Sequence, residues 1–270
     1  KYAEYVQALK EGKTIDGKEV KINASAIFPH DVIAPLMGAH SYYNAPKLSS
    51  TELDSIVAQW EALPNYIKEG NVLPLVDVSG SMMSSLGGKL TALQVAVSLG
   101  LYCADKNLGK FKDTFLTFTS KPELLYLKGD ISKKLDQMVR SDWGGSTDLH
   151  AAFDKILKTA VDGKVPQEEM PTTLLILSDM QFNVCVRHDD SAIEMIRRKY
   201  KDAGYELPKV VFWNLQARDN VPVKFDDSGT ALVSGFSPAI LEAILANDLK
   251  DFTPRAVMLK KIMNPRYDLV

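Results

Sequence analysis

Three oxygen-bearing side chains follow one short apolar segment of the chain. Asp77, Ser79 and Ser81 stand at alternate positions directly after the apolar residues 73–76. A loop at the end of a buried strand could turn all three side chains toward one point. One carboxylate and two hydroxyls offer oxygen ligands, which are the ligands that hard cations such as Mg²⁺ and Ca²⁺ prefer.

Two further segments carry the same chemistry. Thr147 and Asp148 lie in a polar stretch before a predicted helix, and Asp179 lies near the end of a second strongly apolar segment, 172–180. No histidine or cysteine joins these residues at ligand spacing, which argues against zinc and favours Mg²⁺, with Mn²⁺ or Ca²⁺ as alternatives. Two facing carboxylates need a cation unless one of them takes up a proton. Hydroxyl ligands are neutral, so an open coordination position would attract an acidic group from outside.

A local explanation competes with the metal site. Serine and aspartate favour helix N-caps and turns without any metal. Asp148 is predicted to cap the helix that begins at Leu149, while Thr147 points inward. For Asp77 and the two serines, the presence of Thr147 and Asp179 in matching positions favours the metal site over a simple turn.

Strand-like and helix-like patterns alternate from about Leu73 onward. The predicted strands cover 72–78, 114–120, 123–127, 172–180, 209–215 and 230–236, and the predicted helices cover 91–107, 131–139, 149–161, 191–200 and 237–248. The alternation predicts an α/β fold, with a doubly wound, mainly parallel central sheet of about six strands and helices on both faces. The strands 114–120 and 123–127 are predicted to form a hairpin at one edge of the sheet. Ligands of such sheets bind at the carboxyl ends of the strands, where Asp77 and Asp179 emerge.

The N-terminal part of the chain follows another pattern. Residues 1–69 are predicted as a helical extension, with helices over 2–13 and 51–67 and a loop over 23–46. Residues 70–270 form the predicted α/β domain. The chain starts with Lys1 instead of methionine, which favours a piece of a longer protein.

The composition narrows the classes of function. The chain has 270 residues, of which 46% are hydrophobic, which is enough for a substantial core. Its formal net charge of -2 gives no argument for broad nucleic-acid binding. The two cysteines are too few for a disulfide framework and favour a reducing, cytoplasmic location. No apolar stretch approaches the roughly 20 residues that a membrane span needs, so no membrane partner is expected.

The five candidate residues, in their order along the chain, resemble the metal-ion-dependent adhesion site of von Willebrand factor A domains. The likeness covers about residues 70–245 and implies a Rossmann-like von Willebrand A fold. It implies that four residues contact the metal directly or through water: Asp77, Ser79, Ser81 and Thr147. Asp179 would complete or support this shell. Members of the family generally bind partners and are not enzymes.

Two narrower resemblances concern intracellular proteins. The segments DVSGSM at 77–82 and GGSTD at 144–148 resemble the A domain of the Ro/TROVE RNA-binding proteins. The segments AIFPHDVIAP at 26–35 and LSDMQF at 177–182 resemble a DUF2828-type group. In both groups a helical region precedes the A domain.

The sequence therefore predicts a metal-dependent protein-interaction module that binds an acidic group of a protein partner. One alternative is an RNA-binding, Ro/TROVE-like ribonucleoprotein component, which would bind RNA through the N-terminal helices or a region upstream. A metal-dependent hydrolase is a further alternative. Against it, Ser79 stands where haloacid-dehalogenase-like phosphatases carry a second aspartate, and Leu90 stands where a phosphate-binding P-loop needs serine or threonine. No catalytic residue is predicted.

Overall fold

The structure is a computed structural model of the whole chain. It describes the residues in the following ranges: 2–15, 17–20, 22, 27–37, 47–67, 71–88, 90–119, 121–141, 148–179, 190–216, 230–235, 238–245, 255, 258–259 and 262–263. No helix within these ranges is both long and apolar enough to cross a bilayer.

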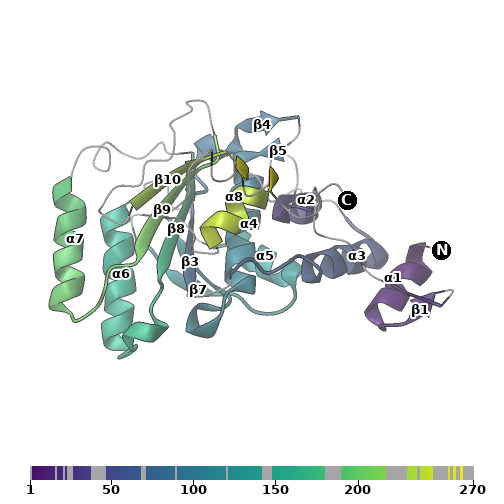
Figure 1. Cartoon of the computed structure of the whole chain (residues 1–270), viewed down its shortest axis with the longest axis horizontal. Coiled ribbons are helices and arrows are strands. Elements are labelled where there is room, and N and C mark those ends of the chain that lie inside the picture. The colour runs from purple at the N-terminus through teal and green to yellow at the C-terminus, as the bar shows by residue number, and fades with distance from the viewer. Residues whose placement is uncertain are drawn as a thin grey trace.

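A six-stranded sheet forms the centre of the molecule (Figure 1). Its strands are β3 (Val72–Val76), β6 (Thr114–Thr117), β7 (Leu124–Tyr126), β8 (Thr173–Ser178), β9 (Lys209–Asn214) and β10 (Thr230–Ser234). They lie in the order β10-β9-β8-β3-β6-β7. Neighbouring strands pair in parallel from β10 to β6, and β7 pairs antiparallel with β6 at the edge. The predicted mainly parallel sheet and its edge hairpin are confirmed.

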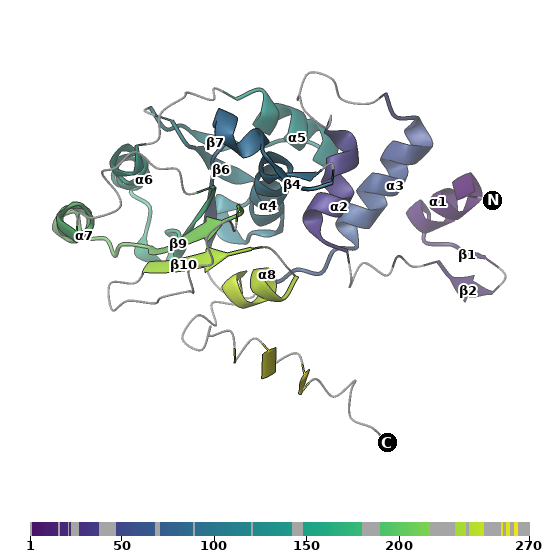
Figure 2. The same cartoon turned by 90° about the horizontal axis from the view of Figure 1, so that it is seen from above.

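Helices cover both faces of the sheet, as Figure 2 shows. Successive side chains of a strand point to opposite faces. In β8, Leu174 and Ile176 join the core beneath α6 (Leu149–Asp162) and α7 (Asp190–Asp202). Leu175 and Leu177 join the core that holds α4 (Ala92–Lys106), α5 (Ile131–Val139) and α8 (Pro238–Leu245). Because both faces are buried, the central strands read as unbroken apolar runs in the sequence.

Helix α4 lies unusually close to the strand that leads to Asp77. A methyl group added to Gly100, in the middle of α4, would overlap Cγ2 of Val76. The helix begins with a capping box in which Thr91 accepts a hydrogen bond from the backbone N–H of Gln94. A larger residue at position 100 would therefore force α4 or Val76, the last residue of β3, to shift.

The N-terminal part contains more regular structure than the sequence predicts. It comprises α1 (Tyr2–Lys10), a hairpin of β1 (Thr14–Ile15) and β2 (Lys18–Glu19), α2 (Pro29–Ile33), a short 3-10 helix (Ala34–Leu36) and α3 (Ser50–Glu61). The loop prediction for 23–46 is wrong at 29–36. Val32 and Ile33 are buried in the same core as α4, and this packing gives a short helix its stability.

The second predicted helix is also too long, because α3 ends at Glu61 instead of residue 67. Pro64 disfavours helical backbone at the residue before it. Instead of continuing the helix, the segment after α3 runs along α4. The Tyr102 hydroxyl of α4 donates to the Pro64 carbonyl at 2.5 Å and accepts from the Tyr66 N–H at 3.1 Å. Burial raises the pKa of Tyr102, which keeps the hydroxyl a neutral donor. The division at residue 69/70 stays a prediction.

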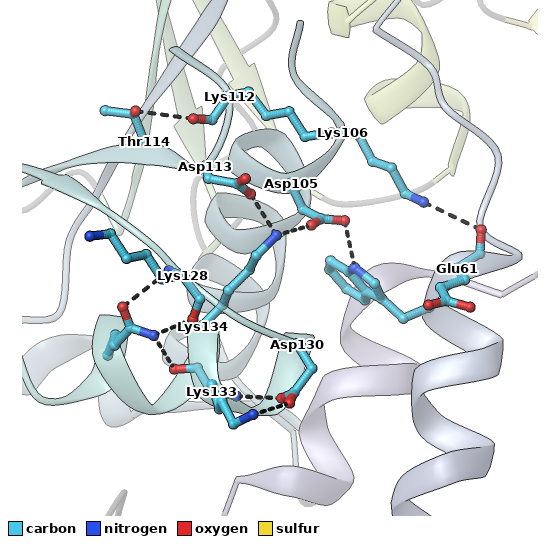
Figure 3. A network of polar contacts seen from close by, with 12 residues as sticks. Glu61, Asp105, Lys106, Lys112, Asp113, Thr114, Lys128, Asp130, Lys133 and Lys134 are labelled. Atoms are coloured by element: carbon cyan, nitrogen blue, oxygen red, sulfur yellow. Dashed lines mark hydrogen bonds and ion pairs between the residues drawn. The ribbon is translucent and has the colours of Figure 1, made fainter. Parts of the chain in front are cut away.

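Buried and partly buried polar groups join α3, α4 and α5 in what we call the Lys134 network (Figure 3). The Lys134 ammonium of α5 donates to Asp105 at 2.5 Å and to Asp113 at 2.6 Å. The indole N–H of Trp60, from α3, donates to the other oxygen of Asp105 at 2.9 Å. The Lys134 side chain is 10% exposed. One basic group thus pairs with two carboxylates from other parts of the chain.

The charge states in this network follow from its hydrogen bonds. Burial by itself would raise the pKa of Asp105, but the hydrogen bonds from Lys134 and Trp60 outweigh it, and the pKa lies below its ordinary value. Burial would lower the pKa of Lys134, but its bonds to Asp105 and Asp113 raise it. Asp105 and Lys134 are therefore both charged at neutral pH.

The Lys134 network lies at the amino end of the parallel strands. Asp113 directly precedes β6. Asn107, two residues after Asp105, accepts from the backbone N–H of Val72 at 3.1 Å and donates to the carbonyl of Val72 at 3.0 Å. Val72 is the first residue of β3.

Candidate metal centre

Asp77 and Asp179 emerge at the carboxyl ends of two neighbouring strands. Asp77 follows β3, and its backbone N–H continues the parallel ladder by donating to the Leu177 carbonyl of β8 at 2.9 Å. Asp179 follows Ser178, the last residue of β8. Both carboxylate residues are buried, with exposed fractions of 4% and 7%.

This edge is also the point where the strand order reverses. From β3 the chain passes to β6 on one side of it and later returns to β8 on the other side. Ligands of open α/β sheets bind outside the carboxyl ends of strands at such a reversal. The two aspartates thus lie where this fold class places its ligand sites.

The loop after β3 gathers the predicted oxygen atoms. Oδ1 of Asp77 accepts a hydrogen bond from the backbone N–H of Ser79 at 2.9 Å, which turns the chain. A 3-10 helix follows at Gly80–Met83. The side-chain oxygens of Ser79 and Ser81 lie 2.9 Å apart. Met82, from the same turn, is fully buried in the core and holds this turn on the domain.

Two polar residues near the site were not predicted from the sequence. The Ser178 hydroxyl donates to Oδ2 of Asp77 at 2.6 Å. The Gln216 side chain, beyond the end of β9, lies with its Nε2 3.4 Å from the Ser81 carbonyl. A hydroxyl directly before a strand-end aspartate is a signal that could have indicated Ser178. Gln216 has no local signal, because its place depends on β9 lying beside β8.

The described donors fit a hard divalent cation. Adjacent ligands of an octahedral Mg²⁺ at its usual bond length lie about 2.9–3.0 Å apart. The two serine oxygens lie 2.9 Å apart, a separation that suits two neighbouring coordination positions as well as a hydrogen bond. Among the described residues, no three His, Cys, Asp or Glu side chains gather as a metal site. A cation here would therefore depend on hydroxyl oxygens as well as carboxylates.

Thr147, the fourth predicted ligand, lies outside the described residues, as do the glycines before it. The next residue, Asp148, caps α6 as predicted and accepts from the backbone N–H of Ala151 at 3.0 Å. The part that Thr147 plays in the site stays a prediction.

The buried residue His30 lies on α2. Its ring packs against Phe28 with centroids 4.7 Å apart, and its Nε2 lies 3.5 Å from a carboxylate oxygen of Asp31. Burial lowers the pKa of His30. These contacts suit a structural side chain.

Comparison with known proteins places the chain in a family. A family model described as "Domain of unknown function (DUF7788)" matches residues 71–262, which is well over half of the chain. The chain belongs to the DUF7788 family. The likeness to a DUF2828-type group stays a prediction.

A viral protein resembles this DUF7788 chain along almost its whole length. The uncharacterized protein L728 of Acanthamoeba polyphaga mimivirus is 34% identical over 267 residues, which cover 96% of this chain. The chain spans 42% of the viral protein, less than half of its length.

A solved structure supports the fold. The crystal structure of the Deinococcus radiodurans RO (RSR) protein matches with a TM-score of 0.55 over 91% of this chain and 53% of the other. The sequence identity is 16%, so the likeness concerns the fold alone. The DUF7788 chain has a Ro-like, Rossmann-like von Willebrand A-type fold.

Proposed function

We propose that this DUF7788 protein is a metal-dependent interaction module that binds an acidic group of a protein partner through a divalent cation. The observation that carries the proposal is the pair of serine oxygens 2.9 Å apart, beside two buried carboxylates at the strand-order reversal. Mg²⁺ is the first candidate for the cation, with Mn²⁺ and Ca²⁺ as alternatives.

Each residue has a role in this proposal. Asp77, Ser79, Ser81 and Thr147 would hold the cation directly or through water, and Asp179 would complete or support the shell. The cation would supply positive charge for a carboxylate of the partner. The two serine hydroxyls are neutral, so they leave this charge available.

Binding explains the site better than catalysis does. Both oxygens of the Asp77 carboxylate accept hydrogen bonds, one from the Ser79 N–H and one from the Ser178 hydroxyl. A nucleophile or general base must instead be directed at a substrate. Asp77 is arranged as a fixed ligand, and we assign no catalytic residue.

The test is calorimetric titration of the full chain with Mg²⁺ and Mn²⁺. We expect the wild type to bind one ion and Asp77→Ala to bind none while keeping its circular dichroism spectrum. Asp136→Ala is the matched control, because it removes an exposed carboxylate on α5 that pairs with Arg140. Equal binding by the wild type and Asp77→Ala would overturn the assignment.

The partner can be sought with the same variants. A protein partner should be retained on the immobilised full chain in Mg²⁺ and released by chelator. It should also fail to bind Asp77→Ala. A protein that binds in chelator or binds the variant equally does not use the proposed site.

RNA binding is the second candidate, and the fold likeness to the Ro protein favours it. Association with RNA would depend on phosphate contacts, so it should weaken steeply with salt. Titration of a labelled single-stranded RNA at several salt concentrations tests this candidate. Salt-dependent binding that Asp77→Ala leaves unchanged would place RNA on another surface.

A further inference from the structure

We propose that Ser178 is a positioning residue of the metal site, which holds the Asp77 carboxylate in its ligand orientation. This inference rests on the proposed function. The Ser178 hydroxyl donates to Oδ2 of Asp77 at 2.6 Å, a short bond of the kind that a charged acceptor forms. Ser178 itself would not touch the cation or the partner.

The backbone of Ser178 is fixed by its pairing with β9. Ser178 is the last residue of β8 and is fully buried. Its carbonyl accepts from the Leu215 N–H at 3.0 Å, and it stands opposite Asn214 of β9 in the parallel register. The hydroxyl is therefore presented from a rigid position between β3 and β9.

Two donors together fix the Asp77 side chain. Ser178 engages Oδ2 and the Ser79 N–H engages Oδ1, so rotation of the carboxylate would break both hydrogen bonds. Each carboxylate oxygen carries two lone pairs, which leaves one on each oxygen for a cation. The two hydrogen bonds thus orient the Asp77 carboxylate and leave lone pairs on it that can coordinate a cation.

The neutral charge of the donor matters for this role. An ammonium group in place of the Ser178 hydroxyl would hold the carboxylate equally well, but it would cancel the charge that attracts the cation. The described contacts of Asp77 come from a hydroxyl and a backbone N–H, both uncharged. Ser178 therefore satisfies a buried carboxylate and keeps it available for metal binding.

The test compares Mn²⁺ affinity among Ser178 variants of the full chain. Changes to groups that orient metal ligands typically cost about 10–100-fold in affinity, and we expect a loss of this size for Ser178→Ala. Ser178→Thr keeps the hydroxyl and should bind within a few-fold of the wild type. Rescue by threonine separates positioning from a general loss of packing.

The chain offers a matched control in α4. Ser98 is also fully buried, and its hydroxyl donates to the Gln94 carbonyl at 2.5 Å. Ser98→Ala removes a buried hydroxyl of the same kind but should leave Mn²⁺ affinity unchanged. If Ser178→Ala does not fold, Ser178→Cys serves instead, and its weaker S–H donor should give an intermediate loss.

The outcomes distinguish this inference from the proposed function. If Asp77→Ala still binds the ion, the proposed metal site fails and the role of Ser178 fails with it. If Asp77→Ala loses the ion while Ser178→Ala binds as tightly as the wild type, only the inference on Ser178 is overturned. Equal losses for Ser178→Ala and Ser178→Thr would also overturn it.

Discussion

The carboxylates at the two ends of strand β3 have partners of different kinds. At the amino end, Lys134 meets Asp105 and Asp113 with a positive charge from the chain itself. At the carboxyl end, Asp77 is met by a hydroxyl and a backbone N–H. The acids at the amino end are paired with a base of the chain, whereas the described contacts of Asp77 come from uncharged donors, which leaves its negative charge available for a ligand.

This difference separates a structural site from a candidate functional one. Buried acids are costly unless they are paired or bind metal. The Lys134 network joins α3, α4 and α5 through its contacts, so its acids have a structural use. The acids at the other end lie where the strand order reverses, at the usual ligand position of the fold.

Loss of the lysine should have the largest effect on stability. Lys134→Met leaves two acids without their base and should lower the free energy of unfolding by about 3 kcal/mol, since breaking a buried pair is strongly destabilising. Urea denaturation measures this change. The control is Lys133→Met, because Lys133 is 72% exposed and its pair with Asp130 should contribute less than about 1 kcal/mol. If Lys134→Met and Lys133→Met lowered the free energy of unfolding by similar amounts, the Lys134 network would have no special structural role at the amino end of β3.

Addition of metal should stabilise the protein through the site at the carboxyl end of β3 and not through the Lys134 network. At a free Mg²⁺ concentration about 100 times Kd, binding to the native state adds about 2.7 kcal/mol. We expect this gain in thermal unfolding of the wild type and of Lys134→Met. Chelator should remove it, and Asp77→Ala should not show it. A gain that persists in Asp77→Ala would place the ion elsewhere.

Trp60→Phe tests the link between α3 and the network. The variant keeps an aromatic ring but loses the indole N–H that donates to Asp105 at 2.9 Å. A hydrogen bond to a charged group contributes about 1.5–3 kcal/mol, so we expect a loss near 2 kcal/mol in urea denaturation. The same change in the Lys134→Met background should cost a different amount, because both residues contact one carboxylate. Strict additivity would contradict a shared network.

Acid should weaken the network within a definite pH range. The folded pKa of Asp105 lies below its ordinary value of 3.8, because the hydrogen bonds from Lys134 and Trp60 outweigh burial. Its contribution is therefore present above that value and is lost as the pH falls through the folded pKa. One proton changes stability by at most about 1.4 kcal/mol per pH unit. The stability difference between wild type and Lys134→Met should shrink below pH 3.8, and a constant difference would contradict the prediction.

Asp77→Asn should have the smallest effect on the metal-free protein. The amide oxygen can still accept from the Ser79 N–H, and the amide NH₂ can donate to the Ser178 hydroxyl. We expect a change below about 1 kcal/mol in urea with chelator present, because a neutral group replaces a buried charge. Mn²⁺ affinity should nevertheless fall sharply. A large loss of metal-free stability would instead give Asp77 a structural role.

The sequence alone determined the order of the elements and most of the candidate ligands. Apolar runs at 72–78 and 172–180 predict central strands, because a strand buried on both faces needs apolar side chains throughout. Asp77 and Asp179 could be placed at one edge of the sheet from this pattern, since parallel strands end at the same edge. The N-cap of α6 at Asp148 could also be predicted from the sequence, because it depends on local hydrogen bonding.

Only the tertiary structure decided which side chains support those ligands. Ser178 contacts Asp77 because β8 pairs with β3, and the two residues are 101 positions apart in sequence. The helix at Pro29–Ile33 and the Lys134 network likewise depend on contacts with α4. Long-range packing brings these residues into contact, and neither the periodicity nor the spacing of residues in the sequence predicts those contacts.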